Sequence, residues 1–98
     1  MKVKKHRSEK VIEVFAVYWI GDKTYFYGWA KGYDGLLTYN VDEVDIIEPS
    51  LSGDFIFFDN GIFYSPLISE GILDGLLEAD QDSYARFLEL LKTEGRID

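Results

Sequence analysis

The stretch from Val11 to Ala30, VIEVFAVYWIGDKTYFYGWA, decides the fold of this chain. It contains seven of the sixteen aromatic residues in the 98-residue sequence. β-branched and aromatic residues dominate both halves, which is typical of strands. Gly21 and Asp22 lie between the halves and suit a tight turn, because glycine adopts positive φ without a steric cost. The stretch therefore predicts a β-hairpin with arms Val11–Ile20 and Thr24–Ala30.

The loop length sets the register of this hairpin. A two-residue loop would place Tyr18 opposite Tyr25 and Ala16 opposite Tyr27, whereas a three-residue loop would shift the second arm by one position. Neither face is polar in either register, so both faces are expected to be at least partly covered. Gly28 in mid-strand indicates a bulge or a large aromatic side chain packed over it. The hairpin is thus predicted to form the centre of the sheet.

Two later regions widen this sheet. Residues 36–47 alternate between apolar and polar side chains and end before Pro49, and they form either one bent strand or two. Residues 54–65, DFIFFDNGIFYS, predict a second hairpin. We place its turn at Asn60 and Gly61, because that pair accepts the positive φ angles of a type I′ turn.

The C-terminal third changes to helical spacing. A helix is predicted from Pro66 to Glu78, but Gly71 and Gly75 weaken it, so it is short, broken or packed very close to the sheet. A second helix begins at residues 80–83, which supply N-cap side chains. Its apolar stripe is Tyr84, Phe87, Leu88 and Leu91. The predicted class is α+β: a mainly antiparallel sheet of four to six strands, including two hairpins, followed by two C-terminal helices packed on one face.

Charge is distributed unevenly along the chain. The net charge is −8, yet five of the ten Lys and Arg residues lie within the first ten positions. Between Lys31 and Arg86 there are twelve acids and no base. We predict a flexible basic arm over residues 1–9 and a single domain over residues 10–98. The arm is either a solubilising tail or a segment that pairs with the acidic body of its own or another copy.

The residue content argues against several kinds of site. There is no cysteine, and the only histidine is His6 in the basic arm, so thiolate sites and histidine-based triads lack their residues. The acids around Asn60 do not match a calcium loop, and no glycine motif matches a phosphate cradle. We therefore predict no metal site, no cofactor and no catalytic residues. The acidic part of the chain is expected to repel nucleic acid and anionic membranes. No stretch reaches the ~18 consecutive apolar residues of a membrane-spanning helix. We therefore expect a cytoplasmic protein.

An acidic body with an aromatic hairpin predicts a non-enzymatic protein-binding module. Charge would speed the encounter with a basic partner and aromatic side chains would hold the complex. In composition alone, the chain is similar to small bacterial immunity proteins and antitoxins, which block toxins such as nucleases. The most concrete hypothesis is therefore an immunity-type inhibitor of a basic toxin or nuclease. The predicted partner-binding residues are Asp42, Glu43, Asp45, Glu48, Tyr25, Tyr27 and Trp29.

Two alternatives stay open at this point. The chain could be a small-molecule-binding or regulatory domain, with a pocket between the sheet and the helices lined by Tyr27, Trp29 and Phe87. It could also be a structural subunit that forms a homodimer through a sheet edge.

Overall fold

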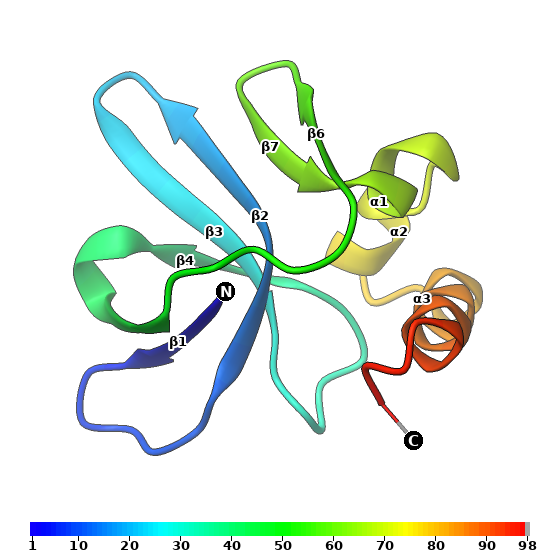
Figure 1. The fold of residues 1–98 in the computed structure, drawn as a ribbon, viewed down its shortest axis with the longest axis horizontal. Coiled ribbons are helices and arrows are strands. Elements are labelled where there is room, and N and C mark those ends of the chain that lie inside the picture. Colours follow the sequence, from blue (N-terminus) through cyan, green and yellow to red (C-terminus); the bar gives the residue numbers. More distant parts are fainter. Residues whose placement is uncertain (98) are drawn as a thin grey trace.

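Strand β2 (Ile12–Ile20) lies at the centre of the sheet in a computed structural model that describes residues 1–97 (Figure 1). The other strands are β1 (Lys2–Lys5), β3 (Lys23–Trp29), β4 (Leu37–Asn40), β5 (Val44–Glu48), β6 (Phe55–Phe58) and β7 (Gly61–Tyr64). The helices are the 3₁₀ turn η1 (Val41–Glu43), then α1 (Ser65–Ser69), α2 (Leu73–Leu77) and α3 (Gln81–Thr93). A mainly antiparallel sheet followed by helices confirms the predicted α+β class.

The β2–β3 hairpin has the register of a two-residue loop. Ile20 pairs with Lys23, and Tyr18 lies opposite Tyr25 as that register requires. The register shifts between Val14 and Ala16, so Phe15 is an extra residue in a bulge. The bulge turns Phe15 into the core beneath the helices, where it is fully buried.

Gly28 has the role that the sequence indicated. A Cβ at this position would overlap the side chain of Ile12 and lie 3.0 Å from the Tyr39 ring. A tyrosine and an isoleucine therefore pack directly over the glycine, and a larger residue there would push them away.

β3 occupies one edge of β2, and two different strands share the other edge. β1 pairs with its first residues, Ile12 and Glu13, whereas β7 pairs with residues 16–18. β1 continues outward to β5, and β7 continues outward to β6. The sheet thus has two branches on this side of β2, one on each side of the bulge.

The N-terminal segment differs from the predicted flexible arm over residues 1–9. Lys2–Lys5 form β1 between β2 and β5, and Val3 is 0% exposed. The alternating pattern explains this, because Val3 points into the core while Lys2 and Lys4 lie across from Glu48 and Asp45. The basic segment pairs with the acidic body of its own chain, which was the alternative expectation.

Residues 36–47 form two strands that lie at opposite ends of the order β4-β3-β2-β1-β5. Four residue steps from Asn40 to Val44 reach at most about 14 Å. Five strands laid flat would separate the outer two by about 19 Å. The sheet must therefore curl, and the curl encloses a core of Val3, Ile12, Val14, Phe26, Ala30, Tyr39 and Val44.

The second hairpin turns one residue earlier than predicted. Its two-residue turn is Asp59–Asn60, where Asp59 has a φ of 53°, and Gly61 already pairs with Phe58 in β7. The reason lies in β2, because a Cβ on Gly61 would come within 2.6 Å of the Val17 carbonyl oxygen and of the Tyr18 Cβ. Gly61 therefore serves the close approach of β7 to β2, and the prediction of a turn at Asn60 and Gly61 was wrong.

The helices cover the outer face of the curled sheet. The first predicted helix is broken, since Gly71 has a φ of 65° between α1 and α2. α3 begins where predicted, and the Asp80 side chain accepts a hydrogen bond from the Ser83 N–H. These helices pack with the sheet around a second core: Phe15, Leu36, Tyr64, Leu67, Ile72, Leu76, Phe87 and Leu91. In residues 1–97 there are seven strands and three α-helices, against the four to six strands and two helices expected.

The pairing of β1 can be tested by two valine substitutions. We predict that Val3→Ala lowers the free energy of unfolding by about 2 kcal/mol, because it removes fully buried apolar area. Val11→Ala is the matched control, since Val11 is 50% exposed and should change stability by less than about 0.5 kcal/mol. Urea unfolding measures both. If both substitutions lowered the free energy of unfolding by the same small amount, residues 1–9 would be a flexible arm.

Candidate functional site

The four predicted acids follow one another along η1 and the edge strand β5, and we call this stretch the acidic corner: Asp42, Glu43, Asp45 and Glu48. All four are exposed. Basic residues of the N-terminal segment also reach this corner, and His6 Nε2 lies 3.4 Å from Asp45 Oδ1. Lys2 and Lys4 of β1 also lie across from Glu48 and Asp45, so basic side chains of the same chain border the acidic corner.

Two of these carboxylates also hold local structure. Glu43 accepts a hydrogen bond from the Asn40 N–H at 2.9 Å and completes a capping box on η1. Glu48 accepts one from the Ser50 N–H, and this bond is the main reason that the pKa of Glu48 is lowered. Both carboxylates thus have a structural role beside any role in binding.

The three predicted aromatic anchors are half-buried on the helix side of β3. The Tyr18 ring stacks on Tyr25 at 5.4 Å and tilts against Tyr27 at 4.6 Å. Burial, followed by the hydrogen bond with Tyr18, raises the pKa of Tyr27 to about 12. The Trp29 Nε1 donates to the Tyr33 carbonyl oxygen and to the Tyr84 hydroxyl. Binding of a partner by these rings stays a prediction.

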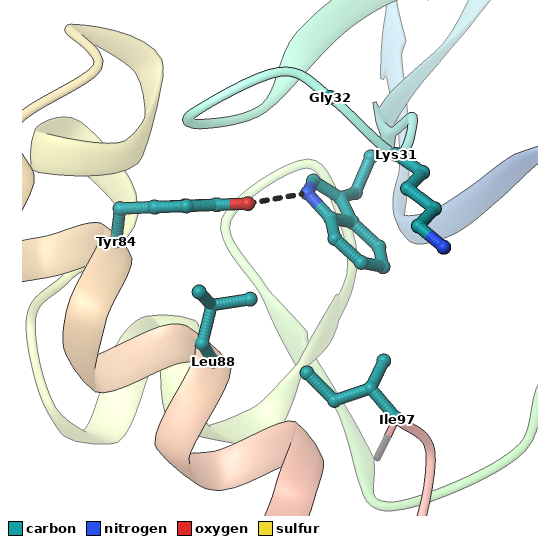
Figure 2. A pocket seen from close by; sticks show the side chains of 6 residues that line it. Lys31, Gly32, Tyr84, Leu88 and Ile97 are labelled. Carbon is teal, nitrogen blue, oxygen red and sulfur yellow. Dashed lines mark hydrogen bonds between the residues drawn. The ribbon is translucent and has the colours of Figure 1, made fainter.

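Packed rings fill the space between sheet and helices in which a pocket was expected. Phe87 is 0% exposed and meets Phe15 edge-on at 5.0 Å and Trp29 at 6.2 Å. A cavity of about 460 Å³ lies instead at the surface, beside Trp29. In Figure 2, Leu88 and Ile97 line it below the Tyr84–Trp29 hydrogen bond. Neither Tyr27 nor Phe87 lines this cavity.

Sequence reasoning missed an exposed apolar surface at the ends of the two hairpins. In Figure 1 the β2–β3 and β6–β7 hairpins project on the same side of the molecule, beyond the helices. Phe57 is 80% exposed, and Trp19 is 40% exposed. We define the hairpin-tip surface as Trp19 and Phe57 on one face of the sheet end together with Ile20, Ile56 and Phe58 on the other, all of which are exposed. Phe57 and Phe58 are both exposed, although phenylalanine is among the residue types most often buried.

Asn60 joins the two hairpin ends. Its side-chain Nδ2 donates to the Trp19 carbonyl oxygen at 2.6 Å, and the Trp19 N–H donates to the Asn60 carbonyl oxygen at 2.9 Å. β7 also pairs with β2 at Tyr18 and Gly61. The hairpin-tip surface is therefore presented by connected elements of one sheet.

Strand β6 forms the outer edge of this surface. Within the described residues it pairs with β7 alone, and exposed Asp54 and Asp59 stand at its two ends. A cavity of about 190 Å³ adjoins Phe58 and is lined by Leu67, Ile68, Gly71, Leu73 and Asp74. Edge strands of this apolar character normally carry a lysine, a proline or a bulge, and the four residues of β6 have neither a lysine nor a proline.

Among residues 1–97, no group of three or more His, Asp or Glu side chains is placed to hold a metal ion. No helix in the same residues is long and apolar enough to cross a membrane. Comparisons with protein-family models, curated proteins and solved structures found no match.

The environment of Glu48 gives a prediction on pH. Its folded-state pKa lies below the usual 4.5, so its stabilising contribution is present above pH 4.5 and is lost as the pH falls through the folded value. An NMR titration of its carboxyl carbon should show a midpoint below 4.5. Ser50→Pro removes the main donor and should raise the midpoint, whereas Lys2→Met should raise it less. A midpoint at or above 4.5 in the unmodified protein would contradict this assignment.

Proposed function

We propose that this chain is a non-enzymatic protein-binding module for a basic protein partner. Its most concrete form is an immunity or antitoxin-type inhibitor that covers the basic site of a toxin or nuclease. The observation that carries the proposal is the hairpin-tip surface, an exposed apolar surface with acids at its rim. Large exposed apolar patches with a polar rim are typical of protein-interaction sites.

The composition of the hairpin-tip surface supports this choice. Aromatic side chains are enriched in interface cores, and Trp, Tyr and Arg are enriched among binding hot spots. Asp54, Asp59 and the turn residue Asp22 are exposed at its rim, and none of them lies in an ion pair among the described residues. Their charges are therefore available to a basic partner.

Charge distinguishes the two acidic regions. Lys2, Lys4 and His6 lie across from acids of the acidic corner. At the ends of β6, Arg96 donates a hydrogen bond to the Ser52 carbonyl oxygen near Asp54, and neither Asp54 nor Asp59 is in an ion pair among residues 1–97. Both regions attract a cationic partner over long range. We assign the close contact to the hairpin-tip surface and the steering of the encounter to the whole acidic body.

The alternative of a small-molecule-binding domain has weaker support. The surface cavity beside Trp29 is large enough for a small ligand. The indole N–H of Trp29, however, already donates to the Tyr33 carbonyl oxygen and to the Tyr84 hydroxyl. Among residues 1–97, Lys31 is then the only charged side chain in the lining, which leaves few groups to orient a ligand.

Binding to a basic toxin can be tested with proteins encoded next to this chain's own gene. Each neighbouring protein of high isoelectric point is produced in cells with and without this chain, and growth is scored. Purified pairs are then compared by stopped-flow at low and at physiological salt. We predict rescue of growth by this chain and an association rate that falls at least about tenfold as salt rises.

Three double variants separate the acidic regions in this assay. One changes the acidic corner (Asp42→Asn with Asp45→Asn), and one changes the ends of β6 (Asp54→Asn with Asp59→Asn). The matched control, Asp34→Asn with Glu78→Gln, removes the same charge elsewhere on the surface. We predict slower association in both test pairs and a smaller change in the control. An association rate indifferent to salt and to all three pairs, or no rescue of growth, would refute the proposal.

A further inference from the structure

We infer that the partner adds an extended strand to the free edge of β6, and that this strand carries apolar side chains between two basic ends. The inference rests on the proposed function, since it describes how the same surface holds its partner. The observations behind it are the unpaired backbone of β6, the acids at both of its ends and the cavity beside Phe58.

The backbone of β6 has unused hydrogen-bonding groups. The Ser65 N–H donates to the Asp54 carbonyl oxygen at 2.7 Å, so these two residues form a hydrogen-bonded pair. Bonded and non-bonded pairs alternate along an antiparallel ladder, so the even-numbered residues of β6 bond to β7. Phe55 and Phe57 then direct their N–H and C=O groups to the free edge. An added strand can bond to these four groups.

The spacing of charges defines the ends of the partner strand. Asp54 and Asp59 are five residues apart, which is about 17 Å in an extended chain. Lys or Arg side chains five residues apart on the partner would lie across from both carboxylates. Between them, side chains on the helix-facing side of the partner strand would lie next to Ile56 and Phe58.

The cavity beside Phe58 favours apolar side chains at those inner positions. Its walls are mainly apolar, with Leu67, Ile68 and Leu73 from the helical segment. Its volume of about 190 Å³ suits a side chain and is too small for most ligands. Asp74 at the same cavity adds a third carboxylate to the surroundings of the partner strand.

A second copy of this chain fits the same edge less well. In an antiparallel pairing of two β6 strands that sets Phe55 against Phe57, Asp59 of each copy would lie across from Gly53 of the other, next to Asp54, so like charges would be neighbours at both ends. Each copy also carries a net charge of −8. A basic strand removes both of these repulsions.

Synthetic peptides test the inference without a known partner. The probe is the hexapeptide Lys-Val-Thr-Val-Thr-Lys, which has basic ends five residues apart and valines on one face. The control peptide has Glu in place of both Lys. In amide NMR spectra of the full chain, we expect saturable shifts and slowed hydrogen exchange at Phe55 and Phe57 with the first peptide, and neither effect with the second.

Two substitutions at Phe57 separate backbone pairing from side-chain packing. Phe57→Ala removes the exposed ring and keeps the N–H, whereas Phe57→Pro also removes the N–H that faces the free edge and spares the ladder to β7. We expect the proline variant to bind the lysine peptide about tenfold more weakly than the alanine variant. Unchanged hydrogen exchange at the β7 amides would confirm that both variants remain folded.

Each other outcome has a distinct meaning. Equal weakening by the two substitutions would overturn strand addition and leave side-chain docking of a basic partner intact. Failure of the lysine peptide to bind would overturn the inference, while rescue of growth in the toxin assay would still support the proposed function. Protection of Phe55 and Phe57 that rises with protein concentration alone would show that a second copy occupies the edge, which also overturns the inference.

Discussion

The division of one edge of β2 between two strands is the constraint on which the rest of the structure depends. β1 takes the beginning of the edge and β7 takes the later part, and the Phe15 bulge lies between them. Because the bulge directs Phe15 toward the helices, it also fixes the core in which Phe87 packs. Gly61 makes the division possible, since no larger residue would allow β7 to approach β2 so closely.

This arrangement explains why apolar side chains are left exposed at the hairpin ends. The β1–β5 branch curls over one face near the start of β2, and the helices cover the opposite face around Phe15. The ends of the β2–β3 and β6–β7 hairpins project beyond the helices (Figure 1). Trp19 of β2 and Phe57 of β6 are exposed there. The candidate site is therefore the part of the sheet that neither cover reaches.

The sequence predicted the features that depend on neighbouring residues and missed those that depend on distant ones. The two-residue register, one of the two that the sequence left open, and an N-cap within residues 80–83 both depend on local chemistry, and the structure has both. The pairing of Val3 depends on β5, more than forty residues away, so the basic segment resembled a free tail. The turn of the second hairpin was misplaced because Gly61 is required by β2 rather than by the turn.

For the candidate site, the sequence indicated the acids of the acidic corner. Strand alternation cannot show which strand lies at the edge of a sheet, so Phe57 was overlooked. The pattern of four apolar residues between two aspartates, with no basic residue nearby, was the available signal.

An exposed apolar edge strand is a hazard for a protein at the concentrations found in cells, because any free strand can pair with it. Natural proteins commonly protect such edges with lysine, whose charge and long side chain discourage pairing. This chain has carboxylates at both ends of β6 instead, and its body carries no base between Lys31 and Arg86. Copies of the chain therefore repel one another at this edge, while a cationic strand is attracted to it. If the partner is a basic strand, as we propose, the same charges disfavour pairing between copies and favour the partner, whereas a lysine at this edge would repel it.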